Sequence, residues 1–124
     1  MTKFRSKFEE RFYKEFHQDI QGYETNKIDY VLTHTYTPDF RIADNVYLET
    51  KGQFHSADRT KMREVIKQNP QVICAIVFMQ PNKLLYGGSK TTYSGWCIKN
   101  GIAWFDFKDK TGIQAFIVKH KDNK

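Results

Sequence analysis

The feature that most constrains the fold is a continuous apolar run at residues 72–79. A strand that is apolar at every position has to be covered on both faces, as in the central strands of parallel sheets. The preceding segment, residues 56–68, has helical periodicity, with Ser56 as a suitable N-cap and Asn69 and Pro70 ending the helix. Its apolar stripe consists of Met62, Val65 and Ile66. The strand–helix–strand order favours a parallel pair with a right-handed crossover, and therefore an α/β fold.

The remaining segments predict further helices and strands in one domain spanning residues 1–124. Phenylalanines at every fourth position indicate an amino-terminal helix over residues 3–17. A strand around residues 30–32 is left open. Gly87 and Gly88 mark a loop, which precedes three expected elements: a short helix over residues 91–100 closed by Gly101, and final strands at residues 102–107 and 113–118.

A β-hairpin is predicted where two runs rich in β-branched and aromatic residues, 34–42 and 46–52, flank a polar turn. Pro38 lacks an amide donor, so its strand should be irregular or unpaired at that point. Asp39 follows directly, and the turn brings it back beside the second strand. The sequence thus places an acidic side chain next to the second strand of the hairpin.

Because side chains alternate along a strand, Glu49 and Lys51 share one face, with Asp39 nearby. Two carboxylates suit Mg²⁺, which prefers hard oxygen ligands and keeps several waters; the carbonyl of Thr50 is a further candidate ligand. Lys51 would orient a water or neutralise charge on a phosphate. A lone Glu-x-Lys is usually only an ion pair across a strand face. Because Pro38 and Asp39 precede this Glu-x-Lys at short range, we favour a metal site over a simple ion pair.

The formal net charge of +6 favours polyanionic partners, namely nucleic acid, anionic membrane or acidic protein. Cys74 and Cys97 have no metal-site spacing and are interpreted as core thiols. No apolar run of about 18 residues or signal peptide is evident, so no membrane is implied and a reducing cytoplasm is expected. The segment at residues 86–90 lacks the Walker spacing, and no nucleotide cofactor is implied.

Pro38-Asp39 and Glu49-Thr50-Lys51 together reproduce the Pro-Asp…(Asp/Glu)-x-Lys motif of the restriction-endonuclease-like superfamily. Within it, the chain resembles the phage endonuclease I family of Holliday-junction resolvases from residue 4 to about 106. The segments that carry this resemblance are residues 4–6, 34–40, 49–52, 86–88 and 94–102. It implies a restriction-endonuclease-like core, a mixed central sheet flanked by helices, and a homodimer that nicks branched DNA with Mg²⁺ or Mn²⁺.

Carried over by position, the resemblance assigns the core catalytic roles to Asp39, Glu49 and Lys51. Glu9 matches an acid on the first helix, and Glu24 matches a further acid. The segment between Glu24 and residue 34 is shorter than the bridge through which the family's dimers exchange elements, so exchange is left open. The family's basic tail is replaced by the short strand expected at residues 113–118.

Four cations on the predicted helix at residues 56–68 are candidates for gripping phosphates beside the cut: Arg59, Lys61, Arg63 and Lys67. Lysine-rich faces are also common on protein surfaces that bind nothing. A DNA affinity that falls steeply with salt would indicate phosphate contacts instead.

Three functions are weighed. The first is a structure-selective endonuclease of branched DNA, acting in the host cytoplasm if phage-encoded. The second is a nuclease of homing, repair or transposition type that cuts duplex DNA. The third is a catalytically silent DNA-binding module.

Overall fold

The central element is a five-stranded mixed sheet with strand order β1-β4-β5-β6-β7, seen in a computed structural model that describes residues 3–30 and 34–121. Its strands are β1 (Gly22–Tyr23), β4 (Phe40–Ala43), β5 (Val46–Lys51), β6 (Ile73–Phe78) and β7 (Trp104–Asp106). β4 and β5 form the predicted antiparallel hairpin, whereas β5, β6 and β7 are parallel. The expected α/β fold, with a mixed central sheet flanked by helices, is confirmed.

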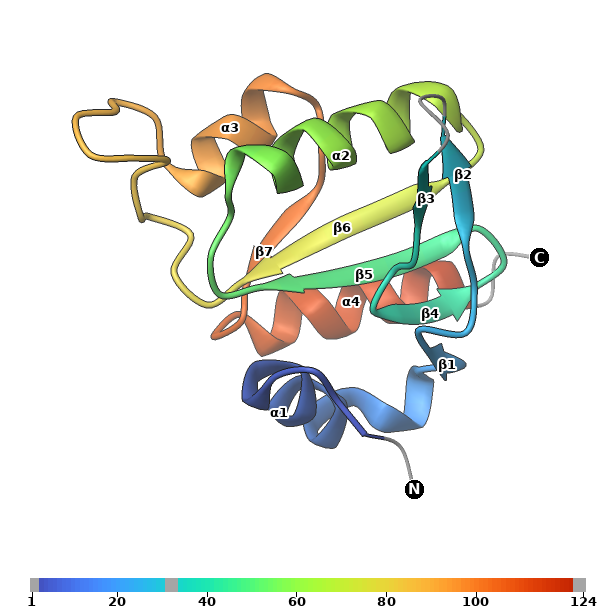
Figure 1. Ribbon diagram of the computed structural model, residues 1–124. Coiled ribbons are helices and arrows are strands. Elements are labelled where there is room, and N and C mark those ends of the chain that lie inside the picture. Colours follow the sequence, from blue (N-terminus) through green and yellow to red (C-terminus); the bar gives the residue numbers. More distant parts are fainter. Residues whose placement is uncertain (1–2, 31–33, 122–124) are drawn as a thin grey trace.

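Helices cover both faces of this sheet (Figure 1). α1 (Lys7–Phe16) and α4 (Lys110–Lys121) lie on one face, and α2 (Ser56–Gln68) and α3 (Tyr93–Lys99) on the other. Along β6, side chains alternate between two apolar clusters: Val77 packs with the phenylalanines of α1, and Ile76 and Phe78 pack with Met62 of α2. From Cys74 to Phe78 the apolar run is therefore buried on both faces, as predicted, whereas Ile73 is exposed.

The predicted strand at residues 34–42 is split into two. β3 (His34–Tyr36) pairs with β2 (Ile28–Tyr30) in a separate antiparallel sheet, and β4 starts at Phe40. Pro38 lies in the gap between β3 and β4, as its missing amide donor led us to expect. Of the strand left open at residues 30–32, Tyr30 belongs to β2, and residues 31–32 lie outside the described residues.

α1 is shorter than the predicted helix, because Ser6 caps it. The Ser6 hydroxyl accepts a hydrogen bond from the Glu9 N–H at 3.1 Å, so Phe4 precedes the helix. A short 3-10 helix, η1 (His17–Asp19), continues from its end. α2 spans the predicted residues, but Ser56 is its first residue, not its N-cap. That position belongs to His55, whose N–H donates to Asp58 Oδ2 at 3.0 Å.

The prediction of a strand at residues 113–118 is wrong, because this segment lies within α4. Asp109 begins the helix by accepting a hydrogen bond from the Gly112 N–H at 2.9 Å. Ile113 and Ile117, four residues apart, are both fully buried against the sheet. Burial at helical spacing overrides the strand preference of β-branched residues. The segment that was expected to replace the family's basic tail with a short strand is therefore a helix.

No helix within residues 3–30 and 34–121 has the length and apolar character that a membrane span requires.

Candidate active site

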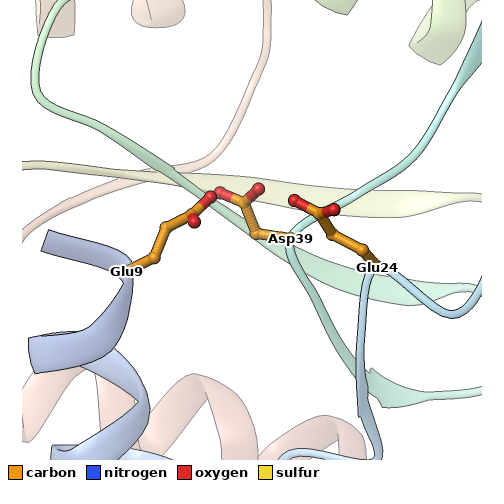
Figure 2. A group of neighbouring side chains, drawn as sticks. All are labelled: Glu9, Glu24 and Asp39. Atoms are coloured by element: carbon orange, nitrogen blue, oxygen red, sulfur yellow. The ribbon is translucent and has the colours of Figure 1, made fainter. Parts of the chain in front are cut away.

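Acidic side chains from three separate segments converge near the carboxyl end of β5 (Figure 2). Glu9 comes from the first turns of α1, Glu24 follows β1, and Asp39 directly precedes β4. One carboxylate oxygen of each lies within 4.8 Å of the others. Glu49 of β5 joins them, since its Oε1 accepts a hydrogen bond from the Asp39 N–H at 3.1 Å. These four acids and Lys51 line one hollow.

Asp39 is held by Thr50 through its side chain and by Glu24 through its backbone carbonyl. Its Oδ2 accepts hydrogen bonds from the Thr50 N–H at 2.9 Å and the Thr50 hydroxyl at 2.8 Å, and its carbonyl accepts one from the Glu24 N–H at 3.1 Å. Pro38 keeps this stretch out of the strand ladder, so the Asp39 side chain turns toward β5. A carboxylate oxygen of Asp39 also lies within 4.8 Å of one from Glu9 and one from Glu24. The role of the Thr50 carbonyl as a ligand stays a prediction.

Glu49 is buried and fixed by a tyrosine. The Tyr36 hydroxyl donates to Glu49 Oε1 at 2.5 Å and lies 3.9 Å from Cys74 Sγ. Burial raises the pKa of Glu49, against the opposing effect of the Lys51 charge. Burial and the charge of Glu49 likewise raise the pKa of Asp39. Burial and the closeness of the two carboxylates thus disfavour their charged forms in the absence of a cation.

Lys51 lies between two carboxylates. Its Nζ is 3.5 Å from Glu49 Oε2 and 3.3 Å from Asp58 Oδ1, and Asp58 stands in the first turn of α2. Burial alone would lower the pKa of Lys51, but the charges of Glu49, Asp58 and Asp39 outweigh it and raise the pKa. Lys51 is therefore a fixed cation at the rim of the acidic hollow.

Glu9 points toward Asp39 (Figure 2) and is held by Tyr23. The Tyr23 hydroxyl donates to Glu9 Oε1 at 2.5 Å, and the same oxygen accepts a hydrogen bond from the Arg5 N–H at 2.9 Å. Arg5 Nε lies 3.2 Å from Glu24 Oε2. Glu24 has a φ of 52°, a conformation that is uncommon for a residue other than glycine.

The donor set fits a hard divalent cation. Four carboxylates from Glu9, Glu24, Asp39 and Glu49 face one hollow, and three of them already lie within 4.8 Å of one another. Oxygen ligands of this kind suit Mg²⁺ and Mn²⁺. Among the described residues lining the hollow, the positive charges come from Arg5, Lys51 and Lys61. A bound cation would neutralise the excess negative charge.

The four cations predicted on α2 do not form one surface. Lys61 lines the acidic hollow. Arg59, Arg63 and Lys67 are spaced four residues apart and lie roughly 200° around the helix from it. Arg59 also has a structural role, since its Nη1 donates to the Phe54 carbonyl at 2.7 Å. Their contacts with DNA stay predictions.

Sequence reasoning missed the residues that hold the acids and the lysine, namely Arg5, Tyr23, Tyr36 and Asp58. For Asp58 a signal existed, because it is an acid in the first turn of a helix that follows the Lys51 strand. For the two tyrosines none existed, since the contacts of Tyr23 and Tyr36 with Glu9 and Glu49 depend on tertiary packing.

Comparison with known proteins gives consistent matches. The family model of phage endonuclease I matches residues 1–122. Endonuclease I of Escherichia phage T7 is 38% identical over 110 residues, which cover 83% of this chain and 72% of that protein. Endodeoxyribonuclease 1 of Enterobacteria phage T3 is also 38% identical over 110 residues, covering 83% of this chain and 71% of the relative.

Proposed function

Because this chain belongs to the phage endonuclease I family, we propose that it is a metal-dependent endodeoxyribonuclease that cuts branched DNA, with four-way junctions as its preferred substrate. The names of the T7 and T3 relatives support endonuclease activity, and that of the T3 relative supports DNA as the substrate. The observation that carries the proposal is the convergence of Glu9, Glu24 and Asp39 within 4.8 Å, beside Glu49 and Lys51.

Asp39 and Glu49 are the principal carboxylates for Mg²⁺ or Mn²⁺, with Glu9, Glu24 and the Thr50 carbonyl as further ligands. The ion supplies Lewis-acid stabilisation of the phosphate charge and lowers the pKa of a bound water. Lys51 then has two tasks, which its position 3.5 Å from Glu49 supports: it orients the attacking water and offsets the charge that develops on the phosphate. Tyr36 and Tyr23 keep Glu49 and Glu9 in place through their hydroxyls.

DNA binding would rest on phosphate contacts. The net charge of +6 supports a polyanionic substrate, and Lys61 is a cation directly beside the acidic hollow. Phosphate contacts fix position and carry no sequence information, which suits recognition by DNA shape. Nicking two strands of a junction symmetrically requires two copies of the site, so we propose that the active unit is a homodimer. Its action would take place where phage DNA is processed, in the host cytoplasm.

The experiment that tests the proposal compares a labelled immobile four-way junction with linear duplex of the same sequence. Wild type and Lys51→Ala are incubated with each DNA, in Mg²⁺ and in chelator. Paired nicks near the branch point that require both the metal and Lys51 are the expected result. Equal cutting of linear duplex would favour a nuclease of homing, repair or transposition type. Junction binding without cleavage in any metal would favour a silent DNA-binding module.

A further inference from the structure

A second hollow lies beside the acidic one, between the paired strands β2 and β3 and the side of α2. With a volume of about 530 Å³, it falls within the roughly 300–1,000 Å³ typical of small-ligand sites. The residues that give it its chemistry are Tyr30, His34, Ser56, Thr60, Lys61 and Glu64. It therefore has room for a group the size of one nucleotide.

The two hollows are adjacent and share two lining residues. Thr35 of β3 and Lys61 of α2 line both of them. A DNA strand whose scissile phosphate lies beside Lys51 has to continue past it on either side. The hollow beyond Lys61 is a concave path for that continuation, directly adjacent to the acids.

The lining matches the parts of a nucleotide. The rings of Tyr30 and His34 stack on each other, 25° apart in plane with centroids separated by 5.6 Å, and a base can extend this aromatic stack. Lys61 is a cation for the phosphate that the two hollows share. A base edge can form hydrogen bonds with the hydroxyls of Ser56 and Thr60 and with the carboxylate of Glu64. That carboxylate already accepts a hydrogen bond from Gln68 at 3.2 Å.

We propose that this hollow binds one unstacked nucleotide of the cleaved strand, next to the scissile phosphate, with its base against Tyr30 and His34. This inference rests on the proposed function and specifies the part of the substrate that the second hollow binds. Unstacking a base costs least where pairing and stacking are already interrupted. A pocket that demands an unstacked base therefore favours branched DNA over linear duplex.

The test uses junctions that carry 2-aminopurine, whose fluorescence depends on the rings that the base stacks against, at successive positions around the cut. Ca²⁺ replaces Mg²⁺ to limit cleavage. The variants are Tyr30→Leu and His34→Ala, and His34 is exposed, so its loss spares the core. The matched control is His17→Ala, which removes an η1 histidine whose ring centroid lies 5.7 Å from that of Tyr13 on α1.

Wild type and His17→Ala should change the fluorescence at one position adjacent to the cut, relative to the free junction. Tyr30→Leu and His34→Ala should lose that change and bind the junction roughly tenfold more weakly, in keeping with the loss of one stacked base. Junction binding by wild type without any such change overturns this inference and leaves the proposed nuclease intact. Conversely, a change that depends on Tyr30 and His34 in a protein that never cleaves in Mg²⁺ would support the hollow and overturn the proposed function.

Discussion

Lys51 is paired more closely with Asp58 than with Glu49, at 3.3 Å against 3.5 Å from its Nζ. Asp58 is itself fixed, because its other oxygen accepts a hydrogen bond from the His55 N–H at the start of α2. The first turn of α2 thus fixes the position of Lys51, the last residue of β5. One aspartate therefore couples the helix cap to the candidate catalytic site.

Replacing Asp58 with asparagine should slow cleavage without weakening DNA binding. Asparagine keeps an oxygen for the His55 N–H but removes the charge that holds Lys51. Misplacement of a catalytic group costs up to roughly 100-fold, so we expect a fall of about 10- to 100-fold in the single-turnover rate. Asp29→Asn, an exposed aspartate on β2, is the control. A rate equal to that of wild type would show that Glu49 alone positions Lys51.

Tyr23→Phe should weaken metal binding while leaving the fold intact. The ring packs edge-on against Phe4 at 4.5 Å and would stay in place, whereas the hydrogen bond to Glu9 would be lost. Outer partners of metal ligands typically contribute 10- to 100-fold in affinity, so we expect the dissociation constant for Mn²⁺ to rise about tenfold. Calorimetric titration measures this. Tyr13→Phe is the control, because its ring packs against the same Phe4. An unchanged constant would contradict the role of Tyr23.

The local parts of this fold were predictable, and the long-range parts were not. The hairpin, α2 and the apolar strand β6 follow from periodicity and turn residues within short windows. Asp39, Glu49 and Lys51 were placed together because a hairpin brings them side by side. Tyr23 and Tyr36 reach Glu9 and Glu49 from 14 and 13 residues away, and no local pattern encodes those contacts. α4 was mistaken for a strand because its β-branched residues outweighed a weak capping signal at Asp109.

The helical assignment of α4 leads to a specific stability prediction. Ile117 is fully buried against the sheet, whereas its neighbour Val118 is 51% exposed. Ile117→Ala should lower the free energy of unfolding by about 2–5 kcal/mol, as large-to-small changes in a core do. Val118→Ala should lower it by less than about 1 kcal/mol. Denaturant titration measures both values. Equal losses for the two variants would contradict the packing of α4.

Without metal, stability should fall as pH rises, because of Asp39. Burial, the charge of Glu49 and a hydrogen bond with Glu9 raise the pKa of Asp39 in the folded state. The folded chain then holds this proton more tightly than the unfolded chain, so its contribution to stability is greatest at acidic pH. That contribution is lost as pH rises from the ordinary aspartate pKa, about 3.9, toward the raised one.

In chelator, Asp39→Asn should therefore melt at a higher temperature than wild type at alkaline pH, with a difference that shrinks toward acidic pH. Adding Mg²⁺ should raise the melting temperature of wild type and leave that of the variant nearly unchanged. Thermal unfolding monitored across the pH range provides the measurement, again with Asp29→Asn as control. A melting difference that is the same at every pH would show that Asp39 carries no excess charge.

The most direct test of the central claim separates binding from cleavage at Asp39. Wild type and Asp39→Asn are each titrated with a labelled four-way junction to measure affinity, and then given Mg²⁺ to measure single-turnover cleavage. The account predicts that the variant binds within about threefold of wild type, because phosphate contacts are spared. Its cleavage should be at least about 100-fold slower, because a metal ligand is lost. Cleavage by Asp39→Asn at the wild-type rate would contradict a metal-dependent site built on Asp39.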